Sequence, residues 1–178
     1  MKYVALLRGI NVGGNTLVKM SELKEVFEKI GFTDVRTYIN SGNVLFESVE
    51  KNDKKLTDKL ESLLTKTFNY NIRVVVKSHD QLKQIISNFP PEWNTQTDLR
   101  CYVGFLTEVI PAMEGAKEIK LKEGIDTLKI AGDVFYMTTL LSKKTKSSFN
   151  RLVGTKIYKE MTIRNYTTVK KLLVLMEV

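Results

Sequence analysis

The stretch of this sequence with the most unusual composition is a glycine-rich segment near the N-terminus, Arg8-Gly9-Ile10-Asn11-Val12-Gly13-Gly14-Asn15. It follows an apolar run and precedes a helical pattern, which is where phosphate-binding loops lie. Its glycine spacing fits neither the dinucleotide-binding nor the Walker pattern, and no Gly-Lys-Ser/Thr closes it. Glycines can still turn backbone N–H groups toward an anion, and Arg8 and Asn11 add polar side chains. Contact with a ligand and a wide turn whose asparagines satisfy its own backbone are equally consistent with this segment.

A second polar segment, Asn40-Ser41-Gly42-Asn43, has the composition of a hairpin turn and comes just after Tyr38. In a βαββαβ unit the first two strands run parallel, so the loop after the first and the turn after the second lie at one edge of the sheet. We therefore expect the two segments to be neighbours and to form a rim lined by glycine and asparagine. Tyr38 is a candidate proton donor if this rim is catalytic.

A third segment places Arg164 and Asn165 directly before the last helical pattern. An arginine beside a helix N-terminus can hold an anion. The alternative is a capping asparagine next to a surface arginine. The three segments predict one ligand-binding site, which comprises Arg8, Gly9, Asn11, Gly13, Gly14, Tyr38, Asn40, Ser41, Gly42, Asn43, Arg164 and Asn165.

The residues needed for several kinds of chemistry are scarce. His79 is the sole histidine and Cys101 the sole cysteine, so a zinc site has no second ligand at the required spacing. No Gly-x-Ser-x-Gly elbow is present, and Cys101 lies in an apolar run that favours a small buried side chain over a nucleophile. We predict no metal and no cofactor, and the sequence assigns no catalytic residue.

Positive charge is concentrated near the C-terminus. Residues 143–171 contain nine Lys or Arg and one acidic residue, Glu160. The net charge of this segment is therefore +8, which equals the formal net charge of the whole chain. Such a segment attracts phosphorylated ligands or a nucleic-acid backbone. A solvated lysine-rich surface is the simpler alternative, because few aromatic residues lie among these cations.

The chain has 178 residues, of which 43% are hydrophobic and 27% charged, the composition of an ordinary globular protein. No apolar run approaches the roughly 18 residues of a membrane span, so we expect no membrane partner. A single cysteine fits a reducing cytoplasm. The oligomeric state does not follow from the sequence.

The hydrophobic pattern repeats the order strand, helix, strand, strand, helix, strand. In the first half these elements are expected at residues 3–8, 21–30, 35–39, 44–48, 53–68 and 72–77, followed by a short helix at 78–87. In the second half they are expected at 101–106, 111–124, 127–130, 134–140, 147–153 and 161–164, followed by a helix at 166–176.

This order predicts an α+β fold made of two ferredoxin-like units with a C-terminal helix. We expect the first half at residues 1–89, a linker at 90–98, and the second half with the last helix at 99–178. Several strands, such as Val4-Ala5-Leu6-Leu7, are apolar on both alternating faces. Both faces of the sheets should therefore be covered, which suggests that the halves cover each other in one compact body.

Three stretches resemble the signature segments of domain-of-unknown-function family 1697. They are Ala5-Leu6-Leu7-Arg8-Gly9-Ile10-Asn11-Val12-Gly13-Gly14, Thr37-Tyr38-Ile39-Asn40-Ser41-Gly42-Asn43-Val44 and Thr162-Ile163-Arg164-Asn165-Tyr166-Thr167-Thr168-Val169. The resemblance implies a duplicated ferredoxin-like fold in a small bacterial cytoplasmic protein. It implies no activity, substrate or cofactor.

Three functions are consistent with the sequence. The first is a binding protein for a phosphorylated small molecule or a nucleic-acid backbone, which the basic segment and the glycine–asparagine rim favour. The second is an interaction module that contacts another protein through the rim. The third is an enzyme acting on a small anionic metabolite, with Arg8 or Arg164 as an electrostatic clamp.

Overall fold

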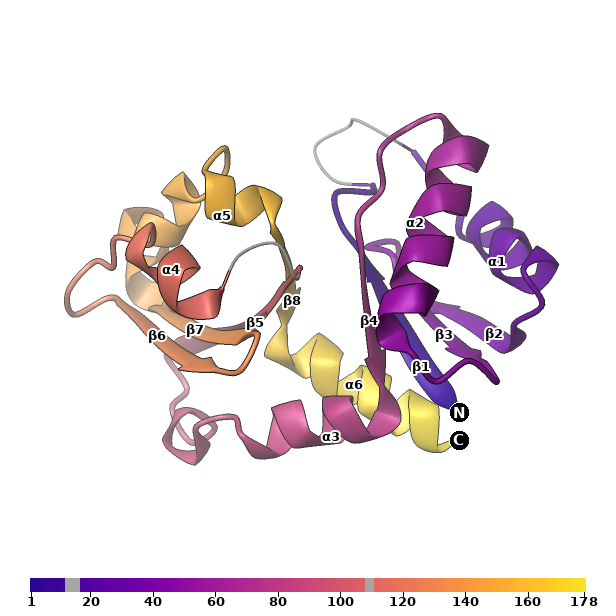
Figure 1. Ribbon diagram of the computed structural model, residues 1–178. Coiled ribbons are helices and arrows are strands. Elements are labelled where there is room, and N and C mark those ends of the chain that lie inside the picture. Colours follow the sequence, from indigo (N-terminus) through magenta and orange to yellow (C-terminus); the bar gives the residue numbers. More distant parts are fainter. Residues whose placement is uncertain (12–16, 108–110) are drawn as a thin grey trace. The chain divides into compact units, whose positions relative to one another are not determined.

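The computed structural model describes residues 1–11, 17–107 and 111–178, and these form two compact units (Figure 1). The first unit comprises Met1–Lys83 and Leu172–Val178, and the second comprises Gln84–Lys171. Each unit contains one four-stranded antiparallel sheet.

The first unit has the strand order β2-β3-β1-β4, in which each strand runs antiparallel to its neighbours. Its strands are β1 (Lys2–Leu7), β2 (Thr33–Tyr38), β3 (Asn43–Glu47) and β4 (Val74–Ser78), and its helices are α1 (Met20–Lys29) and α2 (Asp53–Phe68). Helix α3 (His79–Ser87) begins in this unit. This is the ferredoxin-like order predicted from the sequence.

The second unit repeats this topology with the order β6-β7-β5-β8. Its strands are β5 (Leu99–Leu106), β6 (Asp126–Ala131), β7 (Val134–Leu140) and β8 (Met161–Asn165). Its helical elements are η1 (Pro91–Trp93), α4 (Ala112–Lys117), η2 (Leu141–Lys146), η3 (Ser148–Arg151) and α5 (Lys156–Lys159), and it contains the start of α6 (Tyr166–Glu177). The predicted duplicated α+β fold is therefore confirmed.

Helix α2 shows why the first unit folds as its sequence predicts. The side chain of Asn52 accepts a hydrogen bond from the backbone N–H of Lys55 at 3.0 Å, which caps the N-terminus. Leu56, Leu60 and Leu64 recur at helical spacing and are buried, and the chain leaves the helix at Asn69 in a left-handed conformation. Helices α1 and α2 cover one face of the sheet in Figure 1 and complete its core.

Both faces of β1 are buried, as its continuous apolar sequence predicts. Tyr3, Ala5 and Leu7 belong to the core beneath α1 and α2. Val4 and Leu6 point to the opposite face because side chains alternate along a strand, and both are also fully buried.

The structure differs from the sequence-based elements mainly in the second unit. The helix expected at 111–124 is confined to Ala112–Lys117. The helix expected at 147–153 is the 3₁₀ turn η3. The stretch expected as a linker, 90–98, contains η1 and the buried Trp93, whose ring contacts that of Phe89 edge-on at 5.7 Å.

The end of the C-terminal helix, Leu172–Val178, groups with the first unit, and its Met176 is only 1% exposed. We expect Met176→Ala to lower the free energy of unfolding by about 2–4 kcal/mol, as other large-to-small core substitutions do. Val174→Ala changes the half-exposed neighbour on the same helix and should cost far less. Urea unfolding followed by circular dichroism measures both, and equal losses would contradict this role of Met176.

Candidate functional site

The loop after β1 and the tip of the β2–β3 hairpin lie together, as predicted. The backbone N–H of Leu7 donates to the carbonyl oxygen of Gly42 at 2.8 Å, and the Asn11 side-chain amide donates to the carbonyl oxygen of Asn40 at 2.9 Å. Gly42 has a φ of +74°, and a Cβ there would lie 2.8 Å from the Ile10 side chain. Glycine is therefore required for the hairpin tip to approach the loop so closely.

The asparagines of this rim are used to hold it together. Asn11 accepts a hydrogen bond from the backbone N–H of Val18 at 2.8 Å and donates its two amide hydrogens to the carbonyl oxygens of Val18 and Asn40. Asn43 is fully buried and donates to the Tyr38 carbonyl oxygen at 3.0 Å and the Ser41 hydroxyl at 3.1 Å. The amide donors of both asparagines are thus occupied, which favours a structural role for them over direct ligand contact.

The other predicted rim residues surround this network. Arg8 is half-buried after β1, and its backbone N–H donates to the carbonyl oxygen of Arg73 at 2.9 Å. Gly9 has a positive φ of +70°, Tyr38 ends β2 half-buried, and Asn40 is exposed. The predicted residues Gly13 and Gly14 lie outside the described residues.

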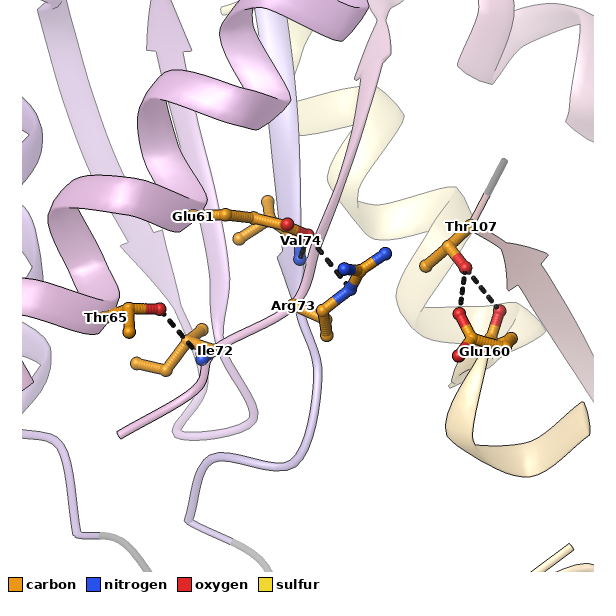
Figure 2. Close-up of polar contacts among 7 residues, drawn as sticks. All are labelled: Glu61, Thr65, Ile72, Arg73, Val74, Thr107 and Glu160. Carbon is orange, nitrogen blue, oxygen red and sulfur yellow. Dashed lines mark hydrogen bonds and ion pairs between the residues drawn. The ribbon is translucent and has the colours of Figure 1, made fainter. Parts of the chain in front are cut away.

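The start of β4, next to Arg8, is attached to helix α2 (Figure 2). One carboxylate oxygen of Glu61 accepts the backbone N–H of Val74 at 2.8 Å and lies 3.3 Å from the Arg73 guanidinium. The Thr65 hydroxyl accepts the backbone N–H of Ile72 at 3.3 Å. These contacts fix the backbone to which Arg8 is hydrogen-bonded.

Ile39 occupies a strained backbone position at the hairpin tip, because it is β-branched, has a φ of +50° and is 48% exposed. We expect Ile39→Gly to be more stable than Ile39→Ala by about 1 kcal/mol. Both variants remove the side chain beyond Cβ, and only alanine keeps a Cβ in the strained conformation. At an ordinary position this order is reversed. Thermal unfolding followed by circular dichroism compares the two variants, and a more stable alanine variant would exclude the strain.

Arg164 and Asn165 lie at the end of β8 in the second unit, whereas the rim belongs to the first. Arg164 is only 8% exposed, so its interpretation as a surface arginine is wrong. Its guanidinium donates to the Thr162 hydroxyl and to the carbonyl oxygen of Ile163, both at 2.9 Å. Burial lowers the pKa of Arg164 to about 10, which leaves it charged at neutral pH.

The sequence reasoning missed a pocket in the second unit. In the first unit the 16-residue helix α2 connects the third and fourth strands, but the corresponding connection in the second unit, residues 141–159, consists of η2, η3 and the short α5 (Figure 1). We call these residues the basic connection. The sequence signal for this difference is the absence from residues 141–159 of a leucine series like that of α2.

A pocket of about 310 Å³ lies between the basic connection and the sheet. Tyr102 of β5, Met137 of β7 and Ile163 of β8 line it from the sheet, and Phe149 and Tyr158 line it from the connection. Its volume is at the low end of the roughly 300–1,000 Å³ of small-molecule sites. Within the described part of the chain, no acidic side chain lines it.

The basic connection is held to the sheet by the buried carboxylate of Asp126, at the start of β6. One of its oxygens accepts the Ser147 hydroxyl at 2.6 Å. The other accepts the backbone N–H of Ser148 at 2.8 Å, the Ser148 hydroxyl at 2.6 Å and the backbone N–H of Lys122 at 3.2 Å. Nearer the start of the connection, Ser142 donates its backbone N–H and its hydroxyl to the carboxylate of Asp98, the residue that precedes β5.

The basic connection carries six cations and no acid, and all six side chains are exposed. None of them forms an ion pair with an acidic side chain that the structure describes. Lys144 also lines the pocket. The six residues are Lys143, Lys144, Lys146, Arg151, Lys156 and Lys159.

Metal and membrane features are absent from the described residues. No group of three or more His, Cys, Asp or Glu side chains is arranged to hold a metal ion there. None of the helices in that part of the chain is long and apolar enough to span a membrane. Burial raises the pKa of the Cys101 thiol, which favours its neutral, less nucleophilic form.

The hydrogen bonds to Asp126 predict a pH-dependent stability of the second unit. Burial alone would raise its pKa, but the bonds from Ser147 and Ser148 outweigh burial and hold it below the ordinary value of 3.8. The stabilisation is therefore complete above about pH 4 and is lost as the pH falls through the lowered pKa. We expect Asp126→Asn to cost about 2–3 kcal/mol at pH 7 and much less at pH 2.

Fluorescence of Trp93, the sole tryptophan, reports urea unfolding of the second unit. Asp58→Asn alters an exposed carboxylate of α2 and is the matched control, with no change expected. An Asp126→Asn cost that is the same at both pH values would contradict this role of the carboxylate.

Comparison with known proteins identifies the family but not a function. A family described as a protein of unknown function, DUF1697, matches residues 1–136, and the chain belongs to this family. A solved structure of the conserved bacterial protein SP0830 from Streptococcus pneumoniae is 27% identical, has a TM-score of 0.84, and matches over 98% of each chain. No curated protein matches this chain. The shared fold extends over both ferredoxin-like units.

Proposed function

We propose that this member of the family binds a phosphate-bearing ligand, either a phosphorylated small molecule or a nucleic-acid backbone, through the basic connection of the second unit. The observation that carries the proposal is the combination of six exposed cations without an acid in residues 141–159 and the pocket beneath them. Exposed cations with no acidic residue among them attract phosphate groups.

The anchoring of the basic connection supports this proposal over a merely solvated lysine-rich surface. A solvated surface needs no fixed backbone, whereas Asp126 and Asp98 hold this one at two points. Hydrogen bonds from Ser142 keep the pKa of Asp98 below its usual range, so the second anchor is also ionised at neutral pH. A fixed set of cations loses less conformational entropy on binding than a mobile one.

The rim of the first unit remains a second prediction for an anion site, with Arg8 as its charged member. Its Asn11 and Asn43 amide donors are already occupied, so we rank it below the basic connection. The single cysteine, Cys101, fits a cytoplasmic protein.

The proposal predicts binding that weakens with salt and depends on the basic connection. We expect Lys144→Gln/Lys146→Gln to weaken binding of a labelled single-stranded oligonucleotide or of inorganic triphosphate about tenfold, and to reduce the oligonucleotide's log–log salt slope by about 1–2. Lys51→Gln/Lys66→Gln removes two exposed lysines of the first unit, gives the same net charge, and should leave binding nearly unchanged.

Fluorescence anisotropy with the oligonucleotide and calorimetry with triphosphate measure these effects at low ionic strength. The proposal fails if neither probe binds the unmodified protein at tens of micromolar. It also fails if the two double variants lose affinity equally, because the attraction would then belong to the net charge alone.

A further inference from the structure

The pocket beneath the basic connection has walls suited to a flat ring. Three aromatic side chains line it from three different elements: Tyr102 from β5, Phe149 from η3 and Tyr158 from α5. Met137 and Ile163 add apolar surface from β7 and β8. Aromatic walls bind planar rings by stacking and do so with little dependence on the ring's identity.

Polar groups occur at only a few points of this pocket. Asn150 donates its amide to the carbonyl oxygens of Lys144 and Thr145, which ties η3 to η2 and leaves the side-chain oxygen of Asn150 as an acceptor for a ligand N–H. Lys144 brings a positive charge to the same lining. A mostly apolar pocket with one cation and one amide acceptor is suited to a ring that carries both N–H groups and a nearby negative charge.

The size of the pocket and its surroundings limit the occupant. About 310 Å³ holds one ring system rather than an extended cofactor. The cations beside it, Lys143, Lys146 and Arg151, are exposed neighbours in sequence of the lining residues Lys144 and Asn150. An apolar ring and a phosphate on the same ligand would therefore meet complementary surfaces on one short segment.

From these observations we infer that the second unit binds a nucleotide, with its base in the pocket and its phosphate on the basic connection. The inference rests on the proposed phosphate binding and adds the class of ligand. The nucleotide is either free or part of a single strand, because both present a base next to a negatively charged phosphate group.

Two ligands with the same phosphate test the inference on the unmodified protein. Adenosine 5′-monophosphate and ribose 5-phosphate differ only in the base, and we expect the first to bind at least tenfold more tightly in calorimetric titrations at low ionic strength. Equal affinities would overturn the base pocket while leaving the phosphate proposal standing. If neither ligand, nor triphosphate, nor the oligonucleotide binds, both proposals fail.

A pair of matched variants tests whether the base binds in this pocket. Phe149→Leu removes a pocket ring, and Phe68→Leu removes a similarly half-buried ring packed against the core of the first unit. We expect only Phe149→Leu to weaken adenosine 5′-monophosphate binding, by fivefold or more, and neither to change ribose 5-phosphate binding. An equal effect of both variants would overturn the assignment to this pocket.

A short oligoadenylate distinguishes the two sources of the nucleotide. If the oligoadenylate binds more tightly than the mononucleotide, and Phe149→Leu weakens its binding by the same factor, the site is assigned to a strand. Weaker binding assigns it to a free nucleotide. Oligoadenylate binding that Phe149→Leu leaves unchanged would contradict the base pocket.

Discussion

The buried carboxylate of Asp126 is the contact on which the basic connection of the second unit depends. It accepts hydrogen bonds from Ser147 and Ser148, about twenty residues later in the chain, and from the backbone of Lys122. They add to the apolar packing of the connection, in which Leu152 and Ile157 belong to the buried core of the second unit. The connection has no counterpart of the leucine series of α2, and a pocket lies between it and the sheet.

The two ferredoxin-like units differ in the segment that connects their third and fourth strands. In the first unit, Leu56, Leu60 and Leu64 fill the space over the sheet, and the asparagine network closes the loop after β1 against the β2–β3 hairpin. In the second unit, the corresponding connection buries Leu152 and Ile157 but has no comparable leucine series, and it carries six exposed cations and no acid.

Local patterns in the sequence predicted the fold and part of the first unit's rim. Helix α2 spans Asp53–Phe68, as its leucine spacing predicts. The topology predicts that the loop after β1 lies next to the hairpin turn, and the hydrogen bond from Asn11 to Asn40 joins them. The pocket could not be predicted in this way, because it depends on hydrogen bonds between Asp126 and serines distant in sequence. The burial of Arg164 was missed for a related reason: charge and helix position indicate an exposed side chain, and only tertiary packing covers it.

The most direct test of this account is the mapping of amide chemical shifts in the ¹⁵N-labelled full chain during titration with adenosine 5′-monophosphate. We expect saturable changes concentrated in residues 139–163, where the pocket walls and the basic connection lie. Changes concentrated instead in residues 8–11 and 38–43 would place the ligand at the rim of the first unit. That result would contradict the assignment of binding to the connection held by Asp126.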